Sequence, residues 1–378
     1  MPEPMPSDAD DDIPTEGIGL CLSGGGYRAM VFHVGALWRL YQANLLAELE
    51  RVSSVSGGSI TAAQLALAWP NLSFDPAQID DDFVPRVVAP IRRMAGVTID
   101  AWSIGGGLLL PGSISDFVAG SFRKHLFGDA TLQDLPDRPR FVINATNLQS
   151  GVLWRFSKPY MRDYRVGEVK NPTVPVATAV AASSAFPPFL SPSILKLDPA
   201  DFTPGSGDDL QREPFTSRVY LTDGGVYDNL GLETVWKNYQ TVFASDGGGQ
   251  LMAEAKPKTD WVRQSNRVLE IVDNQVRSLR KRQLIGSFKS NLRDGTYWGI
   301  RTDIEDYGLE QNGLEPPLPA PFERTLALAE IPTRLRRLSD ELQEQLINWG
   351  YAVCDAALRR HVDQELPRGA FPYESVGI

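Results

Sequence analysis

The sequence predicts an α/β fold: a three-layer sandwich in which a mainly parallel central sheet is covered by helices on both faces. Two successive segments, 18–42 and 52–68, have the same order of a short apolar strand, a glycine turn and a helix. Strand-like apolar runs return at 218–222 and 241–244, and helical patterns follow them. Strands that alternate with helices are typical of a parallel sheet.

The composition is that of an ordinary globular protein, with 42% hydrophobic and 22% charged residues among 378. A formal net charge of −10 argues against a nucleic-acid partner, since such proteins usually carry a basic excess. Two distant cysteines, Cys21 and Cys354, favour a reducing cytoplasmic location and give no metal-ligand spacing. We expect no metal and no other cofactor.

We expect one folded domain. Residues 1–16 are acidic and proline-rich, unlike a signal peptide, which predicts a disordered leader. The single domain then covers 17–378, with a loop-rich insertion around 75–137 and a helical extension from about 260. No uninterrupted apolar stretch approaches the length of a membrane span.

The helices and strands are predicted from the spacing of apolar residues and from the glycines and prolines that interrupt it. The run 18–22 predicts a buried strand, and a helical pattern follows Gly24 to Gly26; 52–55 and 59–68 repeat this order around a Ser-Gly-Gly turn. Residues 140–156 predict a hairpin that turns at 149–151. The later predictions are a small-residue helix ending at Pro187, a loop at 198–216, an amphipathic helix at 263–288 and a C-terminal helix at 339–362.

Ser56 is the candidate nucleophile. A nucleophilic serine stands on a sharp turn from strand to helix, where small neighbours relieve crowding, usually in the pattern G-x-S-x-G. Here Ser54 replaces the first glycine and Gly58 is the second. Because Ser-Gly turns between strand and helix are common, a purely structural turn remains the alternative.

Gly24, Gly25 and Gly26 are candidate donors for an oxyanion. Their backbone N–H groups have no Cβ in front of them, and they precede a helix whose N-terminus carries partial positive charge. A nucleotide-phosphate loop is the competing interpretation. The stretch has neither the G-x-G-x-x-G register nor the G-K-[ST] ending of such loops.

The serine also needs a base. The chain has three histidines, and the order Ser56, an aspartate, His361 would suit a Ser-Asp-His esterase. His361, however, ends an Arg-rich polar helix, His33 lies on an apolar helix face, and His125 follows two basic residues, so a structural or surface role fits each. Asp223 is the other candidate base, because it ends an apolar strand, where active sites gather in such sheets.

Together these motifs resemble the patatin-like phospholipases. That family has G-G-G-x-[RK], a serine elbow a few tens of residues later and D-G-[GA] much further on; here these are 24–28, 54–58 and 223–225. Residues 181–192 also resemble the family's block between elbow and aspartate. The resemblance covers about 17–249 and departs from the pattern at Ser54 and at Ala29, where glycine is common.

The resemblance implies a patatin-like three-layer fold and a lipid acyl hydrolase of the phospholipase A or lysophospholipase type. It makes Ser56 the nucleophile and Asp223 the general base of a dyad that forms an acyl-enzyme, without a metal. The oxyanion hole would be Gly24, Gly25 and Gly26, supported by Arg28, Gly58, Gly224 and Gly225. Asp246-Gly247-Gly248 is a second D-G-G, and we prefer Asp223 because the residues after it fit the family's block better.

Contact with lipid is expected from an apolar, glycine-rich segment. Its candidate substrate-binding residues are Trp102, Leu108, Leu109 and Leu110, which would line or cover the site, unless the segment is packed in the core. A basic run, Arg277 to Arg282, could meet anionic head groups, but the solvated face of a core-packed helix is preferred. The expected partners are a membrane phospholipid or another acyl-ester lipid, with transient, peripheral contact with a membrane surface.

Two other functions remain open at this stage. The chain could be a phospholipase effector that stays silent until a small molecule or a protein activates it. It could also be a binding module without catalysis. Hydrolysis by the purified chain without any activator would distinguish a plain enzyme from the silent effector. Labelling of Ser56 by a fluorophosphonate would exclude the binding module.

Overall fold

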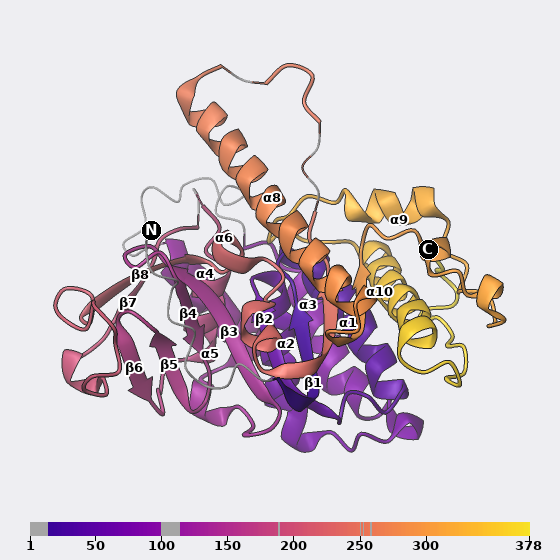
Figure 1. Cartoon of the computed structure of the whole chain (residues 1–378), viewed down its shortest axis with the longest axis horizontal. Helices are drawn as coiled ribbons and strands as arrows, with labels where there is room; N and C mark the ends of the chain where they lie inside the picture. Colours follow the sequence, from indigo (N-terminus) through magenta and orange to yellow (C-terminus); the bar gives the residue numbers. More distant parts are fainter. Residues whose placement is uncertain (1–13, 100–113, 188–189, 250, 252, 258) are drawn as a thin grey trace.

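A mixed sheet runs through the middle of the molecule, in a computed structural model that describes residues 14–378 except 100–113, 188–189, 250, 252 and 258 (Figure 1). Within the described residues it has ten strands in the order β10-β9-β1-β2-β3-β4-β5-β6, with β8 paired to β3 and β7 to β8. The strands are β1 (Thr15–Leu22), β2 (Leu49–Val55), β3 (Arg140–Asn147), β4 (Leu153–Phe156), β5 (Tyr160–Asp163), β6 (Gly167–Lys170), β7 (Ser193–Lys196), β8 (Arg218–Asp223), β9 (Tyr239–Asp246) and β10 (Asp294–Gly299).

The central strands β10, β9, β1, β2 and β3 are parallel, and the sheet continues from β3 with antiparallel strands. The helices are α1 (Gly26–Gln42), α2 (Gly57–Ala68), α3 (Ala89–Ala95), α4 (Ile114–Phe122), α5 (Val176–Ser183), α6 (Gly225–Asp228), α7 (Glu233–Trp236), α8 (Trp261–Lys289), α9 (Phe322–Ala329) and α10 (Asp340–His361). Short 3-10 or π turns lie at Trp69–Asn71, Pro76–Gln78, Val84–Val88, Arg123–Phe127, Leu132–Asp134, Pro199–Asp201, Ile304–Tyr307 and Glu310–Asn312.

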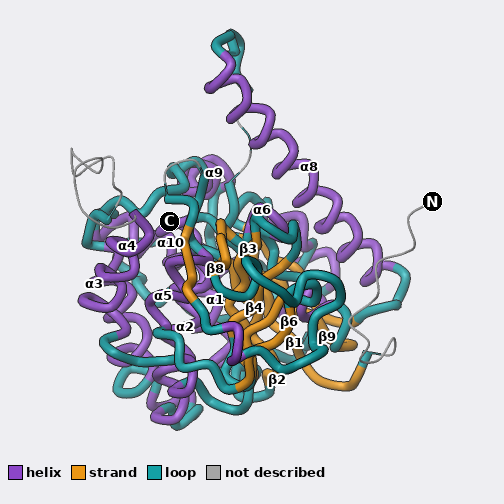
Figure 2. Tube along the Cα trace, turned by 90° about the vertical axis from the view of Figure 1, so that its left-hand side faces the viewer, coloured by secondary structure: helices purple, strands orange, loops and turns teal. Residues whose placement is uncertain are grey.

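The two faces of the sheet bury different sets of side chains. Because successive side chains of a strand point to opposite faces, Leu20 and Leu22 of β1 join the large core with α1, α2 and α10, while Cys21 packs on the other face. That second face is covered by α7, the loop before it and Leu284 of α8. In Figure 2 most helices lie on one side of the strands and α8 lies on the other, which confirms the predicted three layers.

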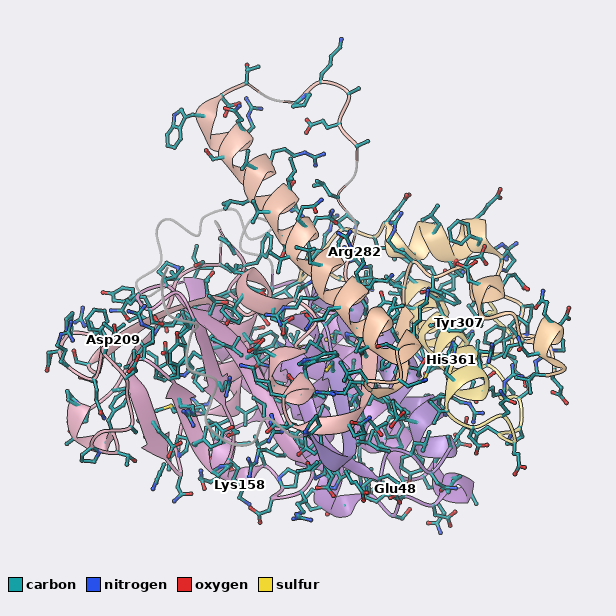
Figure 3. All side chains as sticks on the ribbon, viewed as in Figure 1. Glu48, Lys158, Asp209, Arg282, Tyr307 and His361 are labelled. Atoms are coloured by element: carbon teal, nitrogen blue, oxygen red, sulfur yellow. The ribbon has the colours of Figure 1, made fainter. Side chains whose placement is uncertain are left out.

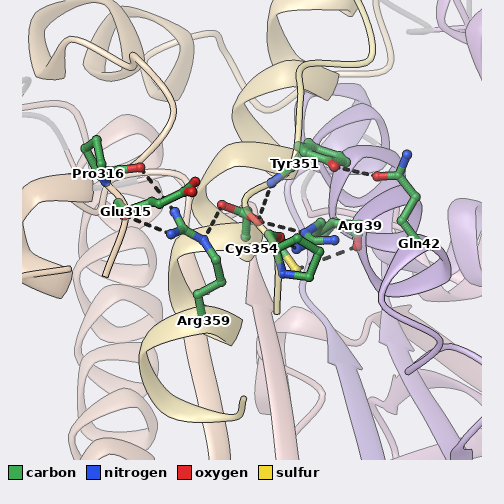
Figure 4. A network of polar contacts seen from close by, with 11 residues as sticks. Arg39, Gln42, Glu315, Pro316, Tyr351, Cys354 and Arg359 are labelled. Carbon is green, nitrogen blue, oxygen red and sulfur yellow. Dashed lines mark hydrogen bonds and ion pairs between the residues drawn. The ribbon is translucent and has the colours of Figure 1, made fainter. Parts of the chain in front are cut away.

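The C-terminal helix α10 packs against α1 in the main core. The two helices approach closely at glycines: a Cβ built on Gly35 would lie 1.9 Å from the Ile347 carbonyl oxygen, and one on Gly350 would lie 1.9 Å from that of Phe32. Asp355 of α10 is fully buried and pairs with two arginines, Arg39 of α1 at 2.8 Å and Arg359 at 2.9 Å (Figure 4). This last helix therefore completes the core that covers α1.

Several predicted elements are confirmed and others differ. The hairpin forms as β3 and β4, and α5 ends before Pro187. The described part of 75–137 is mostly short helices rather than loops, since Phe83, Val87 and Ile91 are buried at helical spacing that prolines 85 and 90 obscure. The sequence analysis did not predict β5, β6, β7, β10 or α9.

Only part of the helix α8 packs against the rest of the molecule. Contacts with α6 and β10 hold it against the second face of the sheet. Its other end, which begins at Trp261, rises away from the molecule (Figures 1 and 2). The solvent-facing side chains of this projecting part include exposed apolar residues.

Candidate active site

Two strands meet end to end on one edge of β3, and this meeting forms the site. The last residue of β2, Val55, pairs with Asn144, and the last residue of β8, Asp223, pairs with Ala145. β4 occupies the opposite edge of β3, so β2 and β8 share one edge and run toward each other. The topology therefore brings Ser56 and Asp223 together although they are far apart in the sequence.

Ser56 stands on a strained turn. Its φ of 50° and ψ of −121° lie in a region that residues with a side chain rarely adopt, and the helix α2 begins directly after it. Its backbone N–H donates to the Ser183 hydroxyl at 2.9 Å. Ser183 in turn contacts Ser59 at 2.9 Å, and Ser59 donates to Ser54 at 3.1 Å. Such a strained, well-supported serine is typical of a nucleophile elbow.

This hydroxyl chain explains the departure of Ser54 from the family pattern. Ser54 is fully buried and donates to the Val142 carbonyl at 3.2 Å, so its hydroxyl is satisfied. The sequence analysis missed Ser59 and Ser183, which support the elbow. Ser183 lies in the segment 181–192 that resembles the family, and this was the only signal for it.

The elbow and the glycine loop touch through their backbones. A Cβ on Gly57 would lie 2.1 Å from the Gly26 carbonyl oxygen, and one on Gly58 would lie 2.4 Å from that of Leu22. Any larger residue at either position would push the two segments apart. The glycines therefore fix the distance between the serine and the loop.

Asp223 is buried beside Ser56. Its carboxylate accepts a hydrogen bond from the Gly225 N–H at 2.7 Å. Burial raises the pKa of Asp223 to about 7, a rise that the Gly225 N–H and the nearby Ser56 hydroxyl reduce and the charge of Asp273 increases. A carboxyl group with such a pKa can take up and return a proton near neutral pH.

Asp246, the second D-G-G aspartate, has the opposite electrostatics. Burial alone would raise its pKa. The nearby Arg277, the Gly248 N–H and the Tyr297 hydroxyl lower the pKa by more than burial raises it, so that it lies below the usual value. Its carboxylate accepts from Gly248 at 2.9 Å and from Tyr297 at 2.8 Å. Asp246 is thus held as a charged, hydrogen-bonded group without contact with Ser56.

The three glycine amides are not equivalent. The Gly24 N–H donates to the Asn229 carbonyl at 3.0 Å. Those of Gly25 and Gly26 have no acceptor among the described residues, and they lie at the N-terminus of α1. Of the predicted oxyanion donors, only these two are free to bind a ligand oxygen.

Arg28 supports the loop from behind. Its buried guanidinium donates to the Gly247 carbonyl at 3.2 Å, to the Ile331 carbonyl and to the Thr333 hydroxyl at 3.1 Å. The Tyr27 N–H also donates to the Arg334 carbonyl at 3.1 Å. A segment from the C-terminal third of the chain therefore helps to hold the glycine loop, which the sequence analysis did not foresee.

The histidines do not contact the pair. His33 is buried with both ring nitrogens engaged, by the Ser245 hydroxyl at 2.8 Å and the Ser23 carbonyl at 2.9 Å, and burial lowers its pKa to about 4. The His361 ring packs against Tyr307 at the far end of α10, where Figure 3 labels both. His125 is exposed in a short π turn.

The other predicted residues divide into three groups. Gly224 and Gly225 lie directly after Asp223, and a Cβ on Gly224 would lie 2.3 Å from the Asn144 carbonyl oxygen. Trp102, Leu108, Leu109 and Leu110 lie outside the described residues. In the basic run of α8, Arg282 is on the solvated face, as expected, whereas Arg280 pairs with Glu233 at 2.8 Å and Arg277 and Lys281 face a cavity.

The chain is similar to a known family of proteins. A family model described as patatin-like phospholipase matches residues 20–236, more than half of the chain. A search of curated protein sequences found no match. In the described part of the chain, no helix is long and apolar enough to cross a membrane.

Solved structures with a similar chain path include two forms of one human enzyme and a bacterial protein. Human GIVD cytosolic phospholipase A2 is 13% identical, with a TM-score of 0.41 over 69% of this chain and 48% of that chain. Its complex with methyl gamma-linolenyl fluorophosphonate is 13% identical, with a TM-score of 0.49 over 90% and 57%. VipD from Legionella pneumophila is 15% identical, with a TM-score of 0.36 over 92% and 67%. The chain spans about half the length of the human chains.

Proposed function

The chain belongs to the patatin-like phospholipase family, and on that premise we propose that it is a lipid acyl hydrolase of the phospholipase A or lysophospholipase type. It cleaves carboxylic esters of membrane lipids through Ser56 and Asp223. The observation that carries this proposal is the meeting, at the adjoining ends of β2 and β8, of Ser56 on its strained turn and a buried carboxylate whose pKa is about 7.

The first half of the reaction forms an acyl-enzyme. Asp223 takes the Ser56 proton as Oγ attacks the ester carbonyl, and the negative charge that develops on the carbonyl oxygen is bound by the Gly25 and Gly26 amides. The carbon–oxygen bond to the alcohol then breaks, and the Asp223 carboxyl returns the proton to the leaving oxygen. The fatty acyl group remains on Ser56.

The second half regenerates the enzyme. Asp223 takes a proton from a water molecule that attacks the acyl-enzyme, and the same two amides bind the second oxyanion. Collapse of this intermediate returns the proton to Ser56 and releases the fatty acid. Neither half requires a group beyond the residues named and water.

Apolar surface near the pair suits an acyl chain. The Asp223 N–H donates to the Ala185 carbonyl at 3.0 Å, which places the next residue, Phe186, beside the strand end. Phe186 and Val226 are each 48% exposed. Two large apolar side chains that flank a polar reactive pair favour a substrate with a hydrocarbon part.

We also propose transient contact with the membrane surface through α8. Trp261, Val268, Val272 and Leu279 repeat at spacings of seven and four, which puts them on one side of the helix, and each is more than half exposed. The end of α8 that begins at Trp261 projects from the body (Figure 1). A helix of this kind can lie in the head-group region of a bilayer.

A fluorophosphonate probe and one short-chain, uncharged ester test the proposal together. The probe should label Ser56 in the wild type and fail to label Ser56→Ala. Asp223→Asn should reduce ester hydrolysis by about 10²–10⁴-fold, the usual contribution of a general base. The matched variant Asp246→Asn should keep most of the activity on this ester, because Asp246 does not touch Ser56.

Two results would contradict this assignment. Greater loss in Asp246→Asn than in Asp223→Asn would move the base to the second D-G-G. A collapse of hydrolysis in His361→Ala would favour the Ser-Asp-His esterase instead.

A further inference from the structure

A cavity of about 330 Å³ lies between α8 and the ends of β9 and β10. Three basic side chains line it: Arg277 and Lys281 from α8, and Arg301 from the turn after β10. Asp246 is the one acidic residue of the lining, and Asn274 and Ser278 add uncharged polar groups. Asn274, Arg277, Ser278 and Lys281 follow the i, i+3, i+4, i+7 spacing of one helix face, so α8 turns a polar face inward here.

The positive charges in this cavity are only partly neutralised by the protein. Among the described residues, Arg277 and Lys281 make no hydrogen bond or ion pair, although Lys281 lies 4.4 Å from the centre of the Tyr297 ring. The Arg301 Nη1 group is buried and has no acceptor in the described structure. The carboxylate of Asp246 is already engaged by Gly248 and Tyr297. Three cations against the Asp246 carboxylate, with Asp273 of α8 also near Arg277, leave an excess of positive charge.

The repulsion among these cations extends to the glycine loop. The pKa of Arg28 is lowered to about 10, first by burial and then by Arg277, an effect that Asp246 opposes and Arg301 increases. The pKa of Lys281 is lowered by burial and by Arg277, against the charge of Asp246. An anion bound in the cavity would offset this repulsion and give Arg301 Nη1 an acceptor.

We propose that this cavity is a binding site for a phosphate group. Its donors come from two sides, α8 and the turn after β10, which suits an anion with oxygens in several directions better than a planar carboxylate. A phosphate ester carries one or two negative charges, which would offset the excess positive charge of the lining. The volume is large enough for a phosphate with a small polar group attached.

The cavity adjoins the proposed catalytic pair through Asn229. A Cβ built on Gly248, at the cavity wall, would lie 3.2 Å from the Asn229 amide nitrogen. The amide oxygen of the same residue would lie 2.3 Å from a Cβ on Gly24 and 2.7 Å from one on Gly225. The phosphate of a phospholipid whose ester reaches Ser56 is therefore one source of this ligand, a step that rests on the proposed function, and a free phosphate ester is the other.

Direct binding tests the site without any use of catalysis. Calorimetric titration of the full chain with glycerol 3-phosphate should show saturable binding, and glycerol should show none. Arg277→Gln and Arg301→Gln should each weaken binding about 10-fold or more, the usual loss for a hydrogen bond to a charged group. Arg277→Lys should restore part of it. Arg282→Gln, an exposed control on α8 (Figure 3), should bind like the wild type.

Hydrolysis then distinguishes the two sources. A lipid headgroup predicts that Arg277→Gln raises KM for phosphatidylglycerol about 10-fold, while KM for diacylglycerol with the same acyl chains stays unchanged. A free phosphate ester predicts the calorimetric loss without any change in the ratio of these two KM values. The proposal is overturned if glycerol 3-phosphate does not bind and the ratio is unaltered in Arg277→Gln. If Arg277→Gln still cleaves the uncharged ester, the proposed function is supported whichever of these outcomes is found.

Discussion

At the scale of single residues, the two aspartates of the D-G-G motifs have different pKa values because their surroundings differ. Asp223 is buried beside a hydroxyl, and its pKa is raised to about 7. Asp246 is buried beside Arg277, and its pKa is lowered. The same tripeptide therefore gives a group that can exchange protons near neutral pH and a group that stays charged.

The raised pKa of Asp223 predicts the pH dependence of hydrolysis. Only the ionised carboxylate accepts a proton from Ser56, so kcat/KM for the uncharged ester should rise with pH and reach half its plateau near pH 7. Because the charge of Asp273 helps to raise this pKa, Asp273→Asn should move the rising limb to lower pH. Glu270→Gln is the control, since Glu270 does not act on Asp223, and an unmoved limb in Asp273→Asn would contradict this account.

The sequence was informative about the proposed reactive residues because motifs are local. Ser56, Asp223 and the glycine loop could each be predicted from a few neighbouring letters. The occupied amide of Gly24 could not, since its acceptor is Asn229, and neither could the contacts of Arg28 with Ile331 and Thr333. Partners that are distant in sequence leave no pattern beside the residue that they bind.

At the scale of elements, the direction of β8 decides where the carboxylate lies. The sequence analysis placed Asp223 at a strand end by analogy with parallel sheets. In the structure β8 is antiparallel to β3 and runs toward the end of β2. The strand was predictable from its apolar run, whereas its direction was not, because strand direction depends on pairing with β3 and on the path of the intervening chain.

Short or exposed elements escaped prediction for a related reason. β10 contains two glycines and a threonine in "DGTYWG", so its pattern is weak, and it becomes a strand by pairing with β9. β5 and β6 are four residues each and belong to the antiparallel extension. Long periodic elements such as α8 and α10 were predicted to within a few residues.

The buried ion network between α1 and α10 predicts a large effect on stability. Asp355→Ala leaves Arg39 and Arg359 buried without their carboxylate, and removing one partner of a buried pair typically costs about 3–5 kcal/mol. Urea unfolding should show this loss. Asp129→Ala is the matched control, because Asp129 pairs with Arg123 on an exposed surface and should change stability little. Equal effects of the two substitutions would refute the role of the network.

At the scale of the whole molecule, the projecting part of α8 should matter for hydrolysis of lipid in a bilayer but not for hydrolysis of a substrate in solution. Replacing Val268 and Val272 by serine should lower hydrolysis of vesicle phospholipid several-fold while hydrolysis of the short-chain ester remains unchanged, since both side chains are more than half exposed. Gln275→Ser, also exposed on α8, serves as the control. Equal losses on both substrates would contradict a membrane role for this helix.

The arrangement of the chain also links its C-terminal third to the site. Residues 331–334 hold the glycine loop, and α10 covers α1, so that a ligand bound to this region could change the position of Gly25 and Gly26. A phospholipase silent until activated would use such a connection. Basal hydrolysis by the purified chain distinguishes this alternative from a constitutive enzyme.

Mass-spectrometric analysis of the products from a defined diacyl phospholipid tests the central claim most directly. The wild type should release a fatty acid and the matching lysophospholipid, while Ser56→Ala and Asp223→Asn, folded to the same extent by circular dichroism, should release neither above background. Undiminished release of both products by Ser56→Ala would show that the hydroxyl at the junction of β2 and β8 is not the nucleophile.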